Sequence, residues 1–360
     1  MDFTISEDRQ MLAETLRRFL ADAWDPETRA VAAYEEPFHQ PQVWTQLCEM
    51  GVLGALVGED VGGFGGDGLD IMVMFEELGR ALAAEPLLGT LMALRLLVAA
   101  GAAEDVAAVM SGQRRAVVAW AEPDDLEEVD GISTTATDTD DGLVVTGRKS
   151  VVYGGPGADL ALVTARRDGI LAVVAVELSD AEVTDYGLID GGGASEVVLD
   201  GVPARLVMAD ASAAVHAALD AGRLALCAEA VGAMQRLFDM TVDHLTARKQ
   251  FGRPLAAFQA LQHRVVDLSI ELEQTRSITI LAASSLDGQD SRRHVAMAKH
   301  LVGRTARLMA EESIQLHGGI GMTWEYPGAH YAKRLVMMDA QLGDADVHLR
   351  TLVDMADGVS

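Results

Sequence analysis

The sequence predicts an α+β protein in three parts. These are an N-terminal helical domain over residues 1–114, a middle antiparallel β domain, sandwich or barrel, over residues 115–207, and a C-terminal four-helix bundle over residues 208–360. Apolar residues recur at helical spacing in the first part, the period changes to that of short strands at Arg115, and helical spacing returns after Val207. A chain of 360 residues, of which 49% are hydrophobic, is long enough for two or three domains.

Helices account for the first part of the chain. Thr4 and Glu7 have the spacing of a capping box, and an apolar face follows at residues 11, 12, 16, 19 and 20. Further helices are predicted at 41–50, at about 69–83, from Pro86 to about residue 100, and briefly before Gly112. The glycine-rich loop at 58–68 lacks the Gly-x-Gly-x-x-Gly spacing of a dinucleotide turn. We therefore expect a flexible loop that packs closely between helices.

Short β-type runs separated by turn clusters form the middle part. The predicted strands are residues 116–120, 143–146, 150–153, 160–164, 171–176 and 196–199. Even spacing of short strands is typical of an antiparallel sandwich or barrel. After residue 207, four amphipathic helical patterns, each with one apolar and one polar face, predict the bundle. The third pattern ends at Gly318–Gly319 and the fourth continues toward Met355.

The composition excludes several classes of partner. A formal net charge of −27 argues against nucleic acid and against an anionic membrane surface, so any anionic ligand needs a local basic site. The sequence has no basic and apolar signal-peptide pattern at its start and no run of about 18 apolar residues. The two cysteines, Cys48 and Cys227, are far apart, which fits core thiols in a reduced cytoplasmic setting and predicts neither a disulfide nor a metal site.

Residues 248–264, RKQFGRPLAAFQALQHR, join the first two predicted bundle helices. Gly252 and Pro254 are stop signals that end one helical pattern before the next begins. Two interpretations are open on spacing alone. The stretch is either a solvated bend in a helix hairpin or an anion clasp, because the guanidinium of Arg suits phosphate geometry.

This stretch and residues 314–327, IQLHGGIGMTWEYP, together resemble the flavin-dependent acyl-CoA dehydrogenase family. The resemblance covers the whole chain and includes Gly62–Gly63, GRALAAEP at 79–86, AEP at 121–123 and TGRKS at 146–150. Each motif is weak alone, and their order and spacing carry the assignment. Within the family, the chain looks most like the small subunit of pimeloyl-CoA dehydrogenase, on residues 225–234, 258–264 and 342–346.

The resemblance implies FAD, held extended across a subunit interface of a dimer or a dimer of dimers. The positions that match the family's ADP clasp are Arg248, Phe251, Gln315, Gly318 and Gly319. An Arg can pair with pyrophosphate oxygens through two donors, and glycines leave backbone N–H groups open to a ligand. The other interpretation of the two glycines is a helix C-cap, and one glycine can do both.

At the flavin end, the resemblance places Val151 and Tyr153 where the family has an aromatic residue and a Thr that cover the flavin. Tyr153 is either a flavin contact, by stacking or hydrogen bonding, or a packing residue. The neighbouring family loop reads AEPDDLEE here, at residues 121–128, and gains acidic side chains. Such side chains disfavour an anionic flavin or acyl-CoA phosphates nearby.

The family reaction is the α,β-dehydrogenation of an acyl-CoA thioester, in which a Glu removes the α proton. The two positions that match the family's base are Gly343 and Gly222, which have no side chain. The nearest carboxylates are Asp344 and Asp346. Asp344 is either a shorter, displaced base or part of a solvated acidic turn, and Asp346 fits the acidic turn better.

Three hypotheses follow from this pattern. In the first, the chain is a small subunit of a hetero-oligomer whose larger paralogous partner supplies the Glu, acting on a medium-chain or dicarboxylyl acyl-CoA such as pimeloyl-CoA. In the second, it is a self-sufficient dimeric or tetrameric dehydrogenase that uses Asp344. In the third, it is a non-catalytic scaffold subunit. The family resemblance adds an electron-transfer flavoprotein as the electron acceptor.

Overall fold

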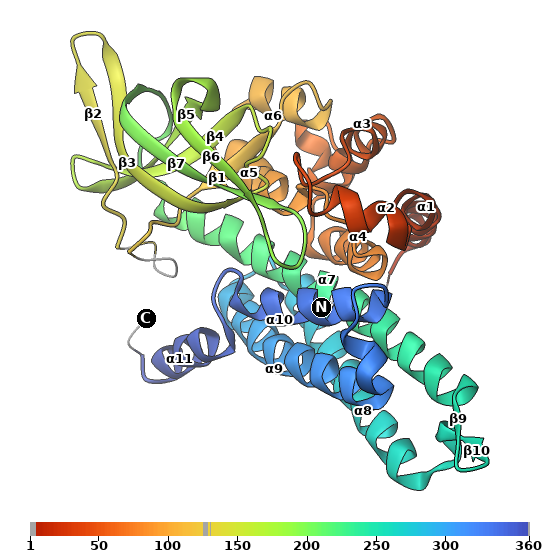
Figure 1. Ribbon diagram of the computed structural model, residues 1–360. Coiled ribbons are helices and arrows are strands. Elements are labelled where there is room, and N and C mark those ends of the chain that lie inside the picture. The colour runs from red at the N-terminus through yellow and green to blue at the C-terminus, as the bar shows by residue number, and fades with distance from the viewer. Residues whose placement is uncertain (1–4, 125–128, 130, 359–360) are drawn as a thin grey trace. The chain divides into compact units, whose positions relative to one another are not determined.

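The computed structural model describes residues 5–124, 129 and 131–358, and it confirms the α+β fold, with helices before and after a sheet (Figure 1). The chain forms two compact units. The first, called the helical unit, comprises Met1–Thr28, Gly68–Ala83 and Arg223–Ser360. The second, called the sheet unit, comprises Arg29–Asp67 and Ala84–Gly222. Each unit combines segments distant in sequence, and the sequence-derived limits at 114/115 and 207/208 stay a prediction.

The helical unit contains the N-terminal helix and the C-terminal helices. Its elements are α1 (Glu7–Ala23), α4 (Gly68–Ala81), α7 (Ser212–Ala247) from residue 223 on, β9 (Lys249–Gln250), β10 (Arg253–Pro254), η4 (Leu255–Ala257), α8 (Gln259–Ser284), α9 (Ser291–His317), η5 (Gly318–Met322), α10 (Pro327–Ala340) and α11 (Ala345–Ala356). Helix α9 packs against α8, α10 and α11. The predicted C-terminal bundle is therefore present.

Helix α1 begins at Glu7, the last residue of the predicted capping box. Ser6 is its N-cap, and the Ser6 hydroxyl accepts a hydrogen bond from the backbone N–H of Arg9 at 3.3 Å. Thr4 lies outside the described residues. Leu16 and Leu20 are buried, whereas Met11 is 59% exposed, so the apolar face of α1 is narrower than predicted.

The fourth predicted helix of the bundle is in fact two helices, and the sequence-based expectation of one continuous helix was wrong. The break falls at Leu342 and Gly343, which have φ angles of 57° and 94°. Two consecutive left-handed residues cannot continue a right-handed helix. Asp344 then starts α11 as its N-cap.

Close helix packing explains two glycines of the helical unit. A Cβ atom on Gly79 of α4 would lie 1.9 Å from the carbonyl oxygen of Glu229 of α7. A Cβ atom on Gly232 of α7 would lie 1.9 Å from the carbonyl oxygen of Glu76. Since neither position admits a side chain, the backbones of α4 and α7 are in contact.

The sheet unit is built around one mixed β-sheet. Its elements are α2 (Pro26–Ala32) from residue 29 on, α3 (Pro41–Glu49), η1 (Val52–Leu56), η2 (Glu59–Val61), α5 (Leu87–Ala99), α6 (Ala103–Met110), β1 (Ala116–Ala119), β2 (Thr135–Thr139), β3 (Gly142–Tyr153), β4 (Leu160–Arg167), β5 (Ile170–Glu177), η3 (Leu178–Asp180), β6 (Glu182–Gly187), β7 (Gly193–Pro203) and β8 (Arg205–Met208). The strand order is β6-β7-β3-β2-β4-β5-β8, with β1 beside β4.

The sheet is mostly antiparallel, but two of its pairings are parallel, which corrects the purely antiparallel expectation. Strand β1 pairs with β4 in parallel, and β2 meets β4 in parallel at Thr135 and Arg166. A parallel pair needs a long connection, and the hairpin of β2 and β3 lies between β1 and β4 in the chain.

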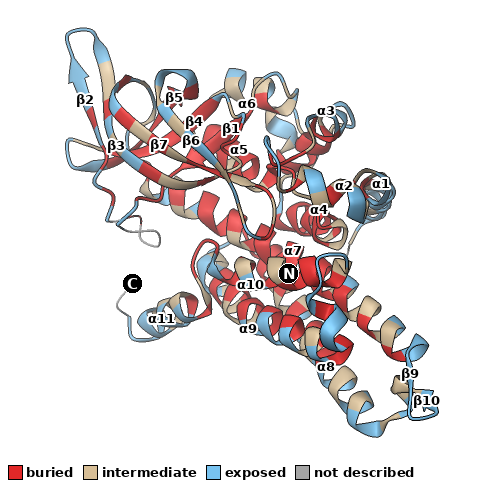
Figure 2. Cartoon of the chain, viewed as in Figure 1, coloured by how far each residue is buried: buried red, intermediate tan, exposed pale blue. Residues whose placement is uncertain are grey.

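Strand prediction succeeded where apolar residues are dense. Two predicted strands, 143–146 and 150–153, form the single strand β3, which remains paired with β7 across two register shifts. Strands β2, β6 and β8 were missed because their sequences are polar or short; in β2 only Ala136 is buried. Buried valines, alanines and leucines of the central strands form the core of this unit (Figure 2).

The glycine-rich loop packs closely, as its composition indicates. A Cβ atom on Gly63 would lie 2.0 Å from the carbonyl oxygen of Val57, and Gly66 has a φ angle of 91°. These positions therefore require glycine. The loop belongs to the sheet unit from residue 58 to 67.

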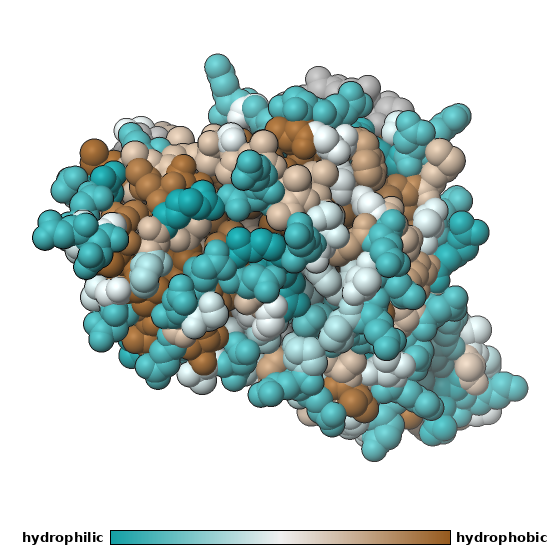
Figure 3. All heavy atoms as spheres, turned by 90° about the horizontal axis from the view of Figure 1, so that it is seen from above, coloured by the Kyte–Doolittle hydropathy of each residue, from teal (hydrophilic) through white to brown (hydrophobic). Residues whose placement is uncertain are grey.

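The surface is largely polar on the face seen in Figure 3, where hydrophilic side chains cover most of the area between smaller apolar patches. This agrees with the high content of acidic residues, which is 55 Asp and Glu against 28 Lys and Arg. Among the described residues, none of the helices has the length and apolar character needed to cross a membrane.

Candidate cofactor and proton-transfer site

A two-residue hairpin presents Phe251 to solvent. Strands β9 and β10 pair antiparallel, and the residues between them, Phe251 and Gly252, have φ angles of 53° and 80°. Positive φ at both central residues is typical of a type I′ turn. Phe251 is 89% exposed and meets the ring of Phe258 edge-on at 6.1 Å, while the Arg253 guanidinium lies 4.0 Å over the Phe258 ring. A large aromatic residue is thus held exposed in a conformation that is unfavourable for it.

Aromatic contacts hold the C-terminal ends of α7 and α9 together. The rings of His244 and His317 are 4.5 Å apart, and those of His317 and Tyr326 are 4.7 Å apart. His317 Nδ1 hydrogen-bonds the Ser313 carbonyl at 2.7 Å, and the Tyr326 hydroxyl hydrogen-bonds His317 Nε2. Burial, followed by the charges of His317 and Arg248, lowers the pKa of His244.

These contacts bring the two halves of the predicted ADP clasp to the same end of the helical unit. The backbone N–H of Arg248 donates to the His244 carbonyl at 2.8 Å, so Arg248 lies one turn beyond the histidine stack on α7. Gln315 precedes His317 on α9, and Gly318 and Gly319 follow it. Residues 67 positions apart in sequence, Arg248 and Gln315, are therefore near the same helix ends, since 315 − 248 = 67.

The two glycines of the clasp combine both interpretations of their sequence. Gly318 is the C-cap of α9, and its backbone N–H donates to the Ile314 carbonyl. A Cβ atom placed on Gly318 or Gly319 would have no described atom within 4 Å. Side-chain packing therefore does not require glycine here, whereas the φ angle of 69° at Gly318 favours it. The open backbone is the kind of surface that a ligand can approach closely.

The clasp residues fit FAD at the ADP end. Arg248 makes no ion pair or side-chain hydrogen bond to any residue within 5–124, 129 and 131–358. Gln315 is exposed on α9, beside the open glycines. A guanidinium without a described carboxylate partner, an exposed amide and glycine backbone that a ligand can approach together suit a pyrophosphate and an adenosine edge.

At the predicted flavin end, a strained β3 residue is fixed by a carboxylate of β7. Val151 has a φ angle of 51°, which is unusual for a β-branched residue. Glu196 accepts hydrogen bonds from the Val151 N–H at 3.2 Å, the Ser150 hydroxyl at 2.6 Å and the Tyr186 hydroxyl at 3.1 Å. Tyr153, two residues on, is half-buried, and its role toward a flavin stays a prediction.

The AEP and TGRKS motifs meet in a buried ion pair. Lys149 Nζ lies 2.8 Å from Glu122 Oε1, and Glu122 also accepts bonds from the backbone N–H groups and hydroxyls of Ser133 and Thr134. Burial alone raises the pKa of Glu122, but the bonds from Lys149, Ser133 and Thr134 outweigh it and bring the pKa to about 2. Burial lowers the pKa of Lys149 to about 8. Both motifs therefore have structural roles; residues 125–128 of the acidic loop lie outside the described residues.

The loop at the first base position is held by a buried lysine. Lys299 Nζ donates to the carbonyls of Met338 at 2.8 Å, Asp339 at 3.0 Å and Gly343 at 2.9 Å. Burial lowers the pKa of Lys299 to about 8. Three carbonyl acceptors use all three donors of the ammonium group, so Lys299 has a structural role in the loop.

Two more basic side chains fix the same loop. Arg223 Nε donates to the Leu342 carbonyl at 3.0 Å, and His348 Nε2 hydrogen-bonds the same oxygen at 3.2 Å. Burial, and then the charges of Arg223 and Lys299, lowers the pKa of His348 to about 3. A Cβ atom on Gly343 would lie 3.0 Å from His348 Nε2. The loop is therefore rigid, and the space beside Gly343 is occupied.

The carboxylate nearest to the base position is engaged in a helix cap. Asp344 Oδ1 accepts hydrogen bonds from the backbone N–H groups of Asp346 at 3.0 Å and Val347 at 2.8 Å. Asp346 is exposed in the first turn of α11. The second base position, Gly222, is buried within α7. The assignment of Asp344 as a base stays a prediction.

Lys299 and His348 were not singled out from the sequence, although a signal existed for Lys299. It lies four residues after Val295, within the apolar stripe of α9, and a lysine on an apolar stripe is seldom buried without several hydrogen-bond partners. No group of three or more His, Cys, Asp or Glu side chains in the described part of the chain could hold a metal ion.

Comparisons with known proteins agree with the fold and with the family resemblance. Residues 6–110 match the family described as acyl-CoA dehydrogenase, N-terminal domain, and residues 212–356 match acyl-CoA dehydrogenase, C-terminal domain. The acyl-CoA dehydrogenase IpdE2 of Mycobacterium tuberculosis is 30% identical over 92% of this chain and 92% of its own length. The chain belongs to the acyl-CoA dehydrogenase family, which is a family of oxidoreductases acting on CH–CH bonds, and its cofactor is FAD.

Two solved structures are similar over almost their whole length. One is a G363A variant of the Tcur3481-Tcur3483 steroid ACAD, with a TM-score of 0.90, 29% identity and 99% of both chains covered. The other is the ChsE4-ChsE5 complex of Mycobacterium tuberculosis, with a TM-score of 0.89, 27% identity and 99% of both chains covered. The likeness to the pimeloyl-CoA subgroup stays a prediction.

Proposed function

We propose that this chain is the subunit without a catalytic base in a heteromeric acyl-CoA dehydrogenase, and that a larger paralogous subunit supplies the Glu. The observation that carries the proposal is the structure around Gly343. In this loop conformation, a residue with a side chain at position 343 is strained at a φ angle of 94°, and its Cβ atom is in tight contact, at 3.0 Å, with His348 Nε2. The loop that other family members use for a base is therefore adapted to glycine in this chain.

The part of the reaction assigned to this chain is binding and orientation. Arg248 pairs with the pyrophosphate of FAD, and the absence of side chains at Gly318 and Gly319 lets the ligand approach the backbone beside it. Gln315 offers an amide to the adenosine end, and the exposed ring of Phe251 offers a stacking surface. FAD, when bound, supplies the acceptor for the hydride that leaves the substrate β-carbon. The partner's Glu takes the α proton.

Three further assignments accompany this proposal. The substrate is a medium-chain or dicarboxylyl acyl-CoA such as pimeloyl-CoA, and the similarity to a steroid ACAD adds steroid substrates to those worth testing. An electron-transfer flavoprotein takes up the electrons. The setting is the cytoplasm, where Cys48 and Cys227 stay reduced; burial raises the pKa of these thiols to about 11 and about 12.

The two-component descriptions of the similar structures support a heteromer. Two different components are named for each of these proteins, ChsE4 with ChsE5 and Tcur3481 with Tcur3483. A self-sufficient homo-oligomer using Asp344 is the second candidate, favoured by the position of Asp344 directly after Gly343. A scaffold that binds no cofactor is less consistent with an Arg248 that has no described carboxylate partner and with glycines that face open space.

The test is to purify the chain alone and with the larger paralogous subunit, and to follow flavin absorbance on addition of acyl-CoA. The proposal predicts bleaching only for the complex, and no effect of Asp344→Asn on the bleaching rate of the complex. Bleaching by the lone chain that disappears in Asp344→Asn supports the second candidate instead. A complex that stays colourless supports the scaffold.

A further inference from the structure

The helical unit contains a cavity of about 390 Å³ among helices α1, α4, α7 and α10. All the described residues around it belong to this unit. Three arginines from three different helices, Arg17, Arg80 and Arg236, line it together with two carboxylates, Asp25 and Glu77. In a chain with a net charge of −27, a cavity in which cations outnumber anions is a local basic site. Such a site favours an anionic ligand.

Both carboxylates of this cavity already have partners. Glu77 accepts two hydrogen bonds from the Arg17 guanidinium, at 2.8 Å and 2.6 Å, and Arg80 Nε lies 3.7 Å from the same carboxylate. Asp25 accepts hydrogen bonds from the backbone N–H and the hydroxyl of Thr28. Arg17 and Arg80 therefore share one carboxylate, and Asp25 is engaged at the start of α2.

The third arginine, Arg236, has no such partner in the described part of the chain. It forms no ion pair and no side-chain hydrogen bond with any residue within 5–124, 129 and 131–358. Its side chain is exposed, so a ligand that enters from solvent can reach it. A guanidinium has five N–H donors in a planar fork that suits a carboxylate or a phosphate. The charge of Arg236 is therefore available to a ligand.

The N-terminus of α10 adds positive potential to the same cavity. Pro327, the first residue of α10, lines the cavity, and the side chain of the N-cap residue Tyr326 does not cap the helix. The N-terminal end of a helix carries a positive partial charge, which is favourable for a nearby anion. The helix end and Arg236 therefore favour the same kind of ligand.

The remaining wall suits a flat apolar body. Trp24 and Tyr331, which are 4% and 7% exposed, line the cavity with Met240 and the two prolines Pro26 and Pro327. Aromatic rings and thioethers pack well against another aromatic ring. The buried indole N–H of Trp24 has no hydrogen-bond partner among the described residues, so this wall lacks an acceptor.

The volume limits the size of the ligand. At about 30 Å³ for each water-sized group, the cavity has room for about thirteen non-hydrogen atoms. A benzene ring with a short carboxylate chain, as in phenylpropionate, stays within this limit. A whole FAD or acyl-CoA does not fit.

The cavity is separate from the predicted ADP clasp. Arg236 precedes Arg248 by 12 residues, since 248 − 236 = 12. At a rise of about 1.5 Å per residue, the two positions are roughly 18 Å apart along α7. An anion held at Arg236 is therefore not bound by Arg248.

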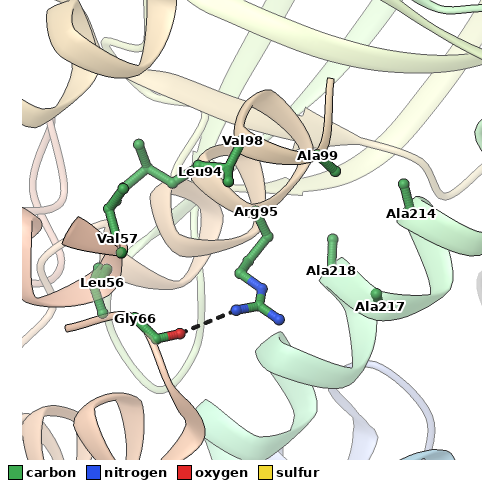
Figure 4. A pocket seen from close by; sticks show the side chains of 11 residues that line it. Leu56, Val57, Gly66, Leu94, Arg95, Val98, Ala99, Ala214, Ala217 and Ala218 are labelled. Carbon is green, nitrogen blue, oxygen red and sulfur yellow. Dashed lines mark hydrogen bonds between the residues drawn. The ribbon is translucent and has the colours of Figure 1, made fainter. Parts of the chain in front are cut away.

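A second cavity, of about 240 Å³, lies in the sheet unit between the glycine-rich loop, α5 and the first turns of α7 (Figure 4). Its described walls are aliphatic or glycine except for Arg95. Arg95 donates to the Gly66 carbonyl at 3.1 Å and has a further interaction within the protein. Since its one cation is already engaged, this cavity gives no reason to expect an anionic ligand.

From these observations, we propose that the cavity of the helical unit binds a small organic anion, with a flat aromatic body against Trp24 and Tyr331 and its anionic group on Arg236. The anionic group is a carboxylate or a phosphate monoester, since both suit a guanidinium fork. The site does not depend on the subunit assignment, because it contains neither of the base positions nor the residues of the clasp.

The experiment measures the binding of three probes to the full chain by calorimetry: phenylpropionate, phenylpropanol and phenylpropylamine. The variants are Arg236→Gln, which removes the charge, and Ala21→Phe, which adds a ring to the cavity wall at an exposed position of α1. Arg292→Gln makes the same exchange at an exposed position of α9 and is the matched control. Arg248→Gln tests whether a probe binds at the clasp instead. Circular dichroism and thermal unfolding verify that each variant is folded.

Phenylpropionate is expected to bind at least about tenfold more tightly than the alcohol or the amine, because only the carboxylate forms a charge-assisted pair. Arg236→Gln removes this preference and Ala21→Phe weakens the binding of phenylpropionate, whereas Arg292→Gln and Arg248→Gln change neither. Should Arg236→Gln fail to fold, Arg236→Lys replaces it, and a reduced preference is expected because an ammonium lacks the planar fork.

Three results overturn the proposal. They are equal binding of the three probes, no binding of any of them, and a preference for phenylpropionate that survives in Arg236→Gln or is lost in Arg248→Gln. None of the probes is a thioester or requires FAD, so a failure of the proposed function leaves these results unchanged.

Two further probes define the ligand. Tighter binding of phenylethyl phosphate than of phenylpropionate assigns the site to phosphate monoesters, and the reverse order assigns it to aromatic carboxylates. Nonanoate has the same carboxylate on an open chain and is expected to bind at least about twofold more weakly than phenylpropionate, because it lacks the ring. Binding of nonanoate as tight as that of phenylpropionate contradicts the aromatic body.

Discussion

Lys299 Nζ donates a hydrogen bond to the backbone carbonyl of Gly343 at 2.9 Å. A buried cation therefore fixes the loop at the position that the family resemblance matches to the catalytic base. The same ammonium group holds the carbonyls of Met338 and Asp339. The shape of this loop is set by the interior of the helical unit, and no carboxylate side chain takes part in these bonds.

Replacing Lys299 by Met is expected to destabilise the helical unit by at least about 3 kcal/mol, because three buried carbonyls lose their donor. Urea unfolding followed by circular dichroism measures the effect. Lys333→Met is the matched control. It removes an ammonium that lies 4.4 Å over the ring of Trp324, a contact worth less than about 1 kcal/mol near the surface. If Lys299→Met and Lys333→Met lower the free energy of unfolding equally, the three bonds of Lys299 to backbone carbonyls do not stabilise the loop.

His348 makes stability depend on acidic pH. Burial holds its pKa at about 3, below the value of 6.5 for an exposed histidine, so between these values the unfolded chain binds more protons than the folded chain. The contribution of His348 to the free energy of unfolding is therefore fully present above pH 6.5. It is lost as the pH falls toward 3, at up to about 1.4 kcal/mol per pH unit.

Comparing pH profiles isolates this contribution from those of the carboxylates. His348→Gln is expected to flatten the loss of stability between pH 6.5 and pH 4. His263→Gln makes the same exchange at an exposed position of α8 and is the control for the substitution itself. Chemical unfolding at half-unit pH steps gives the two profiles. A His348→Gln profile parallel to that of the wild type contradicts the assignment.

Glu122→Gln is expected to cost about 3–5 kcal/mol, because it leaves the Lys149 ammonium buried without its carboxylate. Glu177→Gln breaks the exposed pair with Arg114 and is expected to cost less than about 1 kcal/mol. Thermal unfolding of both variants gives the comparison. A loss of stability in Glu177→Gln as large as that in Glu122→Gln would contradict a structural role of the buried pair.

Arg248→Met is expected to weaken FAD binding by at least about tenfold without changing the melting temperature of the FAD-free chain, because Arg248 has no described internal partner. Fluorescence titration of FAD into the complex of both subunits measures the affinity. Arg253→Met is the neighbouring control, since Arg253 lies over the Phe258 ring. A larger loss of affinity in Arg253→Met speaks against Arg248 as the pyrophosphate ligand.

The sequence predicted the α+β fold because the spacing of apolar residues changes twice, from helical to strand spacing and back. Each of the three segments with a constant spacing is long enough to be recognised. It did not predict β2 or the split between α10 and α11. Strand β2 consists of polar residues that pair with β3 and bury only Ala136, so its apolar pattern is absent. The split depends on positive φ at Leu342, a residue whose side chain gives no sign of a left-handed backbone.

Only part of the candidate site was predicted, because sequence motifs reveal some of its residues and others come together only on folding. Motifs identify Arg248 and the glycines, because these residues are displayed at helix ends. The environment of Gly343 depends on Lys299 and His348, which are 44 residues before and five residues after it, as 343 − 299 = 44 and 348 − 343 = 5. Only the folded chain brings these side chains to neighbouring carbonyls of one loop, that of Gly343 for Lys299 and that of Leu342 for His348. The cap formed by Asp344 is likewise visible only once α11 is known to start there.

The most direct test of the central claim is exchange of the substrate α proton. The chain loaded with FAD, alone or with the larger subunit, is incubated with acyl-CoA in D₂O without oxygen, and deuterium uptake at the α-carbon is measured by mass spectrometry. With both base positions occupied by glycine, the lone chain is predicted to give no exchange above buffer, and the complex to give rapid exchange. Exchange by the lone chain that is lost in Asp344→Asn would show that this subunit carries its own base.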